Sequence, residues 1–145
     1  MATRVIKPFS SDQFTAYDSG FETAADKAKF ANDLVNFVRF DFPQSRFSKK
    51  FYTRLSMCFG HIAHYDINGF YATWFSSTGK RLDWLCHIAK FKTYGDPAFT
   101  YTDVEAAFGT WLRASGIIDQ YTTLYAGEVE DAERAELARL SAKYA

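Results

Sequence analysis

The side chains with the greatest potential for chemistry are two small groups of cysteine and histidine. Cys58, His61 and His64 are spaced three residues apart, and Cys86 and His87 are neighbours. Zinc binds such side chains, and residues three apart share one face of a helix. However, Cys58 and His64 would lie about 120° apart around that helix, which is too far to share one ion. We therefore predict no metal ion and no cofactor.

The same groups could supply a cysteine nucleophile, which needs a nearby base and a third group to orient that base. Both cysteines lie among apolar residues, as buried free thiols often do. The sequence contains no phosphate-binding loop, no G-x-G-x-x-G motif and no G-x-S-x-G motif. The sequence therefore favours a protein without catalytic activity, and a small enzyme or metal-binding protein that uses the cysteine and histidine groups is a third hypothesis.

Positive charge is concentrated in residues 39–92, although the net charge of the chain is zero. Basic residues surround Phe47, Phe51 and Tyr52 in this segment, and such mixtures can bind phosphates and stack on bases. Phe47 and Phe51 are also needed for the core. Nucleic-acid binding is therefore the alternative hypothesis, with these candidate contacts: Arg46, Lys49, Lys50, Arg54, Lys80 and Arg81.

Most of the chain shows apolar residues at helical spacing. The pattern predicts a helix over residues 23–40 with Thr23 as its N-cap, and a second helix from Ser48 that fades near residues 64–66. Residues 67–76 have helical spacing but residue types that also favour strands. We predict a short helix there, with a strand as the alternative, and a further helix after it.

The second half of the chain contains clear helix signals. Residues 102–105 match a capping box, and Gly116 is a suitable C-cap for the helix that follows this box. Residues 117–126 are expected to form a short apolar link. The last helix is predicted to run from about Glu128 to Lys143.

The fold class predicted from these elements is all-α. The chain has 145 residues, the size of one domain, and includes 15 Phe, 9 Tyr and 3 Trp. We expect a compact single-domain bundle of five or six helices over residues 1–145, with an aromatic-rich core and an irregular N-terminal arm at residues 1–20. The sequence has no signal peptide pattern, no long apolar segment and only two cysteines. These features predict a cytoplasmic protein that does not enter a membrane.

Surplus aromatic residues and the absence of a catalytic motif together favour a non-enzymatic interaction protein that docks on a protein partner. Small domains of this kind are frequent among phage and mobile-element products, so an inhibitor or adaptor role is the leading hypothesis. A homo-oligomer stays open. Polar residues beside the apolar stripe of the second helix are the candidate partner contacts: Arg54, His61, His64, Tyr65 and Asn68.

Overall fold

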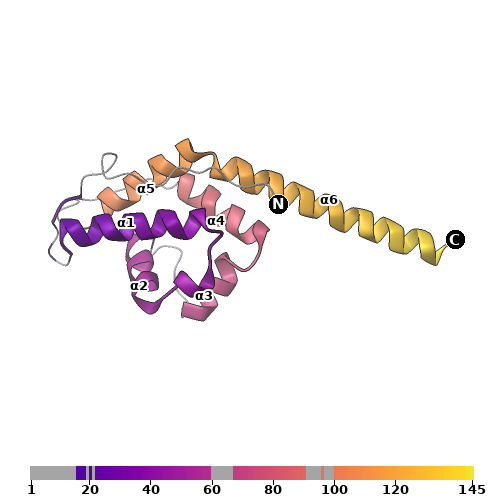
Figure 1. The fold of residues 1–145 in the computed structure, drawn as a ribbon, viewed down its shortest axis with the longest axis horizontal. Coiled ribbons are helices and arrows are strands. Elements are labelled where there is room, and N and C mark those ends of the chain that lie inside the picture. The colour runs from indigo at the N-terminus through magenta and orange to yellow at the C-terminus, as the bar shows by residue number, and fades with distance from the viewer. Residues whose placement is uncertain (1–15, 19, 21, 60–66, 91–95, 97–99) are drawn as a thin grey trace.

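The computed structural model describes residues 16–18, 20, 22–59, 67–90, 96 and 100–145. These residues form six α-helices, one 3-10 turn and no strand, so the all-α prediction is confirmed and residues 67–74 are helical. The elements follow one another along the chain as α1 (Ala24–Arg39), η2 (Gln44–Arg46), α2 (Lys49–Cys58), α3 (Ile67–Trp74), α4 (Thr78–Lys90), α5 (Thr102–Ser115) and α6 (Ile117–Lys143) (Figure 1).

Two predicted N-caps and one C-cap are confirmed. The Thr23 hydroxyl accepts a hydrogen bond from the Asp26 amide at 3.1 Å, and the Ser48 hydroxyl accepts one from the Phe51 amide at 3.1 Å. Gly116 separates α5 from α6 with φ of 78°, a left-handed conformation that a residue without a Cβ adopts at little cost. Local side-chain signals therefore set these three boundaries.

The predicted capping box at residues 102–105 is wrong. Thr102 is the first residue of α5 and Tyr101 is the N-cap, and the Tyr101 side chain makes no capping hydrogen bond. The Glu105 amide instead donates to the Tyr101 carbonyl at 2.9 Å, while the Thr102 amide donates to the Thr100 hydroxyl at 3.2 Å. Because the helix begins one residue earlier than predicted, the residues of the box do not occupy capping positions.

Two predicted helix boundaries also differ from the structure. The helix that was expected to reach residues 64–66 ends at Cys58, and residues 60–66 lie outside the described residues. The predicted link over residues 117–126 and the predicted last helix are one continuous helix, α6. Gly127 in its interior costs about 1 kcal/mol relative to alanine, and the flanking Ala, Glu and Leu residues favour a helix strongly enough to outweigh this cost.

The interior is built mainly from aromatic rings, as predicted. α1 packs along α5, and α4 packs on α3, α5 and the first part of α6. The buried rings come from every helix: Phe30, Phe37, Phe42, Phe47, Phe51, Phe59, Phe70, Phe75, Trp84, Tyr101, Phe108, Trp111 and Tyr121. Their centroids are mostly 5–6.5 Å apart in tilted and edge-to-face arrangements, the spacing that aromatic pairs prefer.

A strained turn after α1 places one of these rings at the centre of the core. Asp41 and Phe42 have φ of 67° and 54°, which L residues rarely adopt. Two tyrosines hold this turn: the Tyr121 hydroxyl donates to Asp41 at 2.8 Å, and the Tyr71 hydroxyl donates to the Phe42 carbonyl at 2.6 Å. The turn therefore directs a fully buried Phe42 ring between α3, α4 and α6.

Of the N-terminal arm predicted over residues 1–20, the structure describes residues 16–18 and 20, and these are not helical. The remaining residues of that arm lie outside the described part of the chain. Within the described part, no helix combines the length and the apolar character needed to cross a bilayer.

Candidate interaction surface

The free end of α6 is the most exposed part of the described structure. Ile117 and Tyr121, at the start of the helix, are buried against the body. From Tyr125 to Ala145 every residue is exposed, and this part of α6 projects away from the other helices (Figure 1). We call residues 125–145 the α6 arm.

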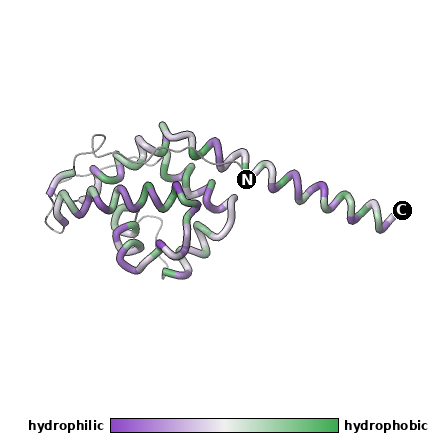
Figure 2. The backbone as a smooth tube through the Cα atoms, viewed as in Figure 1, coloured by the Kyte–Doolittle hydropathy of each residue, from purple (hydrophilic) through white to green (hydrophobic). Residues whose placement is uncertain are grey.

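The α6 arm carries large apolar side chains that the chain itself leaves uncovered. Leu137 is 65% exposed and Tyr144 is 76% exposed, and Tyr125, Val129 and Leu140 are exposed as well. Hydrophobic and hydrophilic residues alternate along this arm (Figure 2). The body buries most of its large apolar side chains, with Phe40 and Met57 among the exceptions. A cluster of exposed large apolar side chains is typical of a surface that binds another macromolecule.

Ion pairs along the helix support the α6 arm. The Arg134 guanidinium donates to Glu130 at 2.7 and 3.0 Å, and the Arg139 guanidinium donates to Glu136 at 2.6 and 2.9 Å. Arg139 lowers the pKa of Glu136 below its usual value. Such pairs stabilise an isolated helix only slightly, and helices in proteins gain most of their stability from packing of an apolar face.

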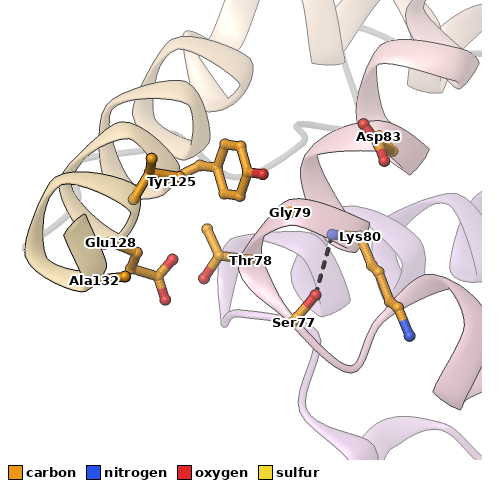
Figure 3. A pocket seen from close by; sticks show the side chains of 9 residues that line it. Ser77, Thr78, Gly79, Lys80, Asp83, Tyr125, Glu128 and Ala132 are labelled. Carbon is orange, nitrogen blue, oxygen red and sulfur yellow. Dashed lines mark hydrogen bonds between the residues drawn. The ribbon is translucent and has the colours of Figure 1, made fainter. Parts of the chain in front are cut away.

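A groove of about 470 Å³ opens between the base of the α6 arm and the start of α4 (Figure 3). Ser77 caps α4 because its hydroxyl accepts from the Lys80 amide at 3.3 Å. The Tyr125 ring lies directly over Gly79, where a Cβ would come within 2.9 Å of the ring. The groove thus has an aromatic wall and charged edges, and these residues line it: Ser77, Thr78, Gly79, Lys80, Asp83, Tyr125, Glu128, Val129 and Ala132.

A second polar group lies on the other side of the body, where Lys27 of α1 meets α5. Lys27 is fully buried, and its ammonium donates to the Thr100 carbonyl at 2.8 Å and to both Asp103 oxygens at 3.2 Å. Asp103 also accepts from the Tyr17 amide at 2.9 Å. Nearby, Glu22 forms an ion pair with Arg54 and accepts from the Tyr101 hydroxyl at 2.9 Å. These contacts tie Tyr17, Glu22 and Lys27 to α2 and to the start of α5.

Burial raises the pKa values of ionisable groups near Lys27. Burial raises the pKa of Cys58 well above its usual value, and the charges of Glu105 and Asp103 raise it further. Burial and the Glu22 carboxylate likewise raise the pKa of Tyr101. A thiol that stays protonated at neutral pH is a poor nucleophile. This polar group therefore serves the fold, and its chemistry does not suit nucleophilic catalysis by Cys58.

Glu105 supplies a pH-dependent prediction. Burial, followed by the charge of Asp103, raises its pKa to about 7 from 4.5. A carboxyl with a raised folded-state pKa stabilises the fold below its unfolded pKa and loses that contribution as the pH rises toward 7. Glu105→Gln is therefore expected to raise the free energy of unfolding at pH 8 by about 1 kcal/mol, allowing for screening of this partly exposed group, and to have no effect near pH 4.5.

Chemical denaturation of wild type and Glu105→Gln at the two pH values measures this difference. The matched control is Glu128→Gln, which changes an exposed carboxylate on the α6 arm and is expected to leave the free energy of unfolding unchanged at both pH values. An equal effect of Glu105→Gln at both pH values would contradict the assignment of the raised pKa to this residue.

The structure describes only two of the five predicted partner contacts. Arg54 lies on α2 and is mostly buried against Glu22, whereas Asn68 is exposed on α3. The other three residues, His61, His64 and Tyr65, lie outside the described part of the chain. A contact face on this flank therefore stays a prediction.

Most of the candidate nucleic-acid contacts have partners within the chain. Arg46 lies over the Phe40 ring at 4.9 Å, Lys80 donates to the Ala72 carbonyl at 3.2 Å, and Arg81 donates to the Phe75 carbonyl at 2.8 Å. Arg54 pairs with Glu22. The remaining two, Lys49 and Lys50, are exposed in the first turn of α2. These interactions position the cations for the fold, and nothing in them indicates a shared phosphate site.

Of the cysteine and histidine groups, the structure describes Cys58, Cys86 and His87. Cys58 is buried, Cys86 is partly buried on α4, and the His87 ring lies 6.4 Å from the Trp74 ring. His61 and His64 fall outside the described residues. Among those residues, no three His, Cys, Asp or Glu side chains are grouped so that they could hold a metal ion.

Sequence reasoning missed the α6 arm as a candidate surface. The last helix was expected to begin at about Glu128, and its acidic residues Glu128–Glu136 were interpreted as a solvated helix start. The sequence carries only a weak signal for the arm, namely large apolar residues such as Tyr125, Val129, Leu140 and Tyr144 within an otherwise polar segment.

The chain matches no protein-family model, no curated protein and no solved structure. Its function must therefore be inferred from its own side chains and their arrangement.

Proposed function

We propose that this chain is a non-enzymatic interaction protein that binds a protein partner through the α6 arm. The observation that carries this proposal is the run of exposed residues from Tyr125 to Ala145, which includes Leu137 and Tyr144. An isolated helix in water is marginally stable, because only packing of its apolar face adds substantially to its stability. A partner that covers this face would supply that packing.

The α6 arm suits recognition of one helix by another protein surface. Its large exposed apolar residues form two groups with spacings of three and four: Tyr125 and Val129, and then Leu137, Leu140 and Tyr144. Such spacing is how a helix presents anchors to a groove or to a second helix. Such binding needs no cofactor and would allow an inhibitor or adaptor role. We further propose a cytoplasmic setting, where free thiols such as Cys58 and Cys86 stay reduced.

The test is affinity purification from the native host with three forms of the full chain. The wild type is compared with Leu137→Glu/Leu140→Glu, which charges the apolar face of the α6 arm, and with Ala135→Glu/Ala142→Glu, which charges the opposite side of the same exposed helix. We expect the wild type and the alanine-site control to retain the same partner and the leucine-site variant to lose it. Recovery of the same proteins with all three forms would contradict the proposal.

A further inference from the structure

We infer that the partner of the α6 arm is a second copy of this chain, bound antiparallel along the arm. The inference rests on the proposed function and names the partner for the same surface. It is supported by three features of the arm and its base: the spacing of the apolar residues, the distribution of charge, and the groove beside Tyr125.

Three apolar positions at each end of the α6 arm have the same spacing when read inward. From Tyr125, Val129 and Ala132 follow after four and then three residues on the same side of the helix. From Tyr144, Leu140 and Leu137 follow inward after four and then three residues. All six project from one side of the helix, within an arc of about 140°.

This symmetry is what a two-fold interface requires. In such an interface, if residue i contacts residue j of the other copy, then j also contacts i. An antiparallel pair with its two-fold axis between residues 134 and 135 places Tyr125 opposite Tyr144 and Val129 opposite Leu140. The same register places Ala132 opposite Leu137, so that a small side chain meets a large one.

The charges of the α6 arm favour the antiparallel orientation over the parallel one. Residues 125–134 carry four carboxylates and one arginine, whereas residues 135–144 carry two cations and one carboxylate. Antiparallel pairing brings the acidic half of each copy against the basic half of the other. It places Glu128 of one copy on the same edge of the interface as Arg139 and Lys143 of the other. In-register parallel pairing would bring the four carboxylates of each copy together, which is repulsive.

One like-charge contact opposes the inferred register. Glu133 would lie opposite Glu136 of the second copy. The carboxylate of Glu136 is already bound by Arg139 of its own chain. Because this cation neutralises Glu136, the repulsion between the two carboxylates is reduced.

The groove at the base of the α6 arm lies where the end of the second arm would arrive. Tyr125 and Tyr144 are nineteen residues apart, a distance of about 29 Å along a helix. In the antiparallel register, Tyr144 of the second copy meets Tyr125 at the edge of the groove (Figure 3). Lys143 of that copy would face the acidic side chains Asp83 and Glu128. The groove therefore matches both the aromatic ring and the charge of the arriving end.

Sedimentation velocity of the full chain over a range of micromolar concentrations tests the association. We expect a species of twice the 16.6 kDa chain mass that grows with concentration. Leu137→Glu/Leu140→Glu is expected to return the chain to monomer mass, and Ala135→Glu/Ala142→Glu is expected to stay dimeric. Thermal unfolding followed by circular dichroism should show an intact body in both variants, since the substituted residues are exposed.

Carbodiimide coupling of the unmodified dimer tests the orientation. Lys143 and Glu128 of one arm are fifteen residues apart, or about 22 Å along a helix, so a zero-length amide bond between them can form only between chains. We expect mass spectrometry to identify this link in the dimer fraction. A dimer that lacks it, or one that persists in the leucine-site variant, would overturn the inferred interface.

The two experiments separate the inference from the proposed function. A chain that stays monomeric while the α6 arm still retains a different protein in the purification overturns the second-copy partner and leaves the proposed function standing. A chain that stays monomeric and retains nothing through the arm overturns both.

Discussion

Lys27→Met is expected to lower the free energy of unfolding by about 3–5 kcal/mol, because it leaves a buried carboxylate without its cation. Lys27 is 0% exposed, and the Asp103 side chain that it binds is only 6% exposed. The same substitution removes the donor to the Thr100 carbonyl. A domain of ordinary stability has about 5–15 kcal/mol in total, so this single change should leave a marginal fold. Urea denaturation of wild type and variant measures the effect.

A second substitution distinguishes loss of the ion pair from loss of packing. Asp103→Asn removes the carboxylate charge that Lys27→Met leaves unpaired. The double variant Lys27→Met/Asp103→Asn should therefore lose less free energy of unfolding than the two single variants lose in sum. A strictly additive result would mean that the two side chains do not stabilise each other. A loss below about 1 kcal/mol for Lys27→Met alone would contradict the buried pair altogether.

Phe42→Ala is expected to cost about 3–5 kcal/mol through the cavity it leaves in the core. The ring is fully buried, and its centroid lies 5.0 Å from that of Phe75 and 5.2 Å from that of Phe37. It also meets the rings of Trp84 and Tyr121. Because these rings come from α1, α4, α6 and the residue that follows α3, the substitution should destabilise the whole body. It should appear as one cooperative transition at lower denaturant concentration.

The left-handed backbone at Phe42 makes this prediction more specific. Phe42→Gly removes the same ring and also relieves the strain of φ at 54°. Glycine should therefore be no worse than alanine at this position, although glycine elsewhere costs about 0.4–1 kcal/mol more through the unfolded chain. Phe47, with φ of −89°, is the matched control. There, Phe47→Gly should have a lower free energy of unfolding than Phe47→Ala. The same order at both positions would contradict the strained turn.

Local signals predicted the beginnings of α1 and α2 because the capping atoms lie within three residues of the amides they accept from. The aromatic core followed from helical spacing in the same way. The strained turn at Asp41 and Phe42 could not be predicted, since it depends on Tyr121, which is 80 residues away from Asp41. Interactions at that separation leave no pattern in a single sequence.

The candidate site shows the same difference between local signals and contacts between residues far apart in the sequence. Arg54 lies beside the apolar stripe of α2, and sequence reasoning placed it on a contact face. The structure pairs Arg54 with Glu22, 32 residues earlier, and buries most of it. Lys27 was missed for the converse reason, because a single lysine in a helix usually faces water. The α6 arm was missed because an exposed helix is recognised by what fails to pack on it, and only a three-dimensional structure shows that.

Hydrogen exchange along α6 tests the central claim most directly, because it reports how much support each helical segment receives. In the dilute full chain, we predict rapid exchange of amides in residues 127–143 and slow exchange in α1 and α4. When the arm is covered, by concentration or by an added partner, its amides should gain protection while those of α1 and α4 stay unchanged. Two results would contradict an α6 arm that is uncovered in the single chain and covered by a partner. One is arm amides that are as protected as those of α1 at every concentration, and the other is arm amides whose exchange a bound partner leaves unchanged.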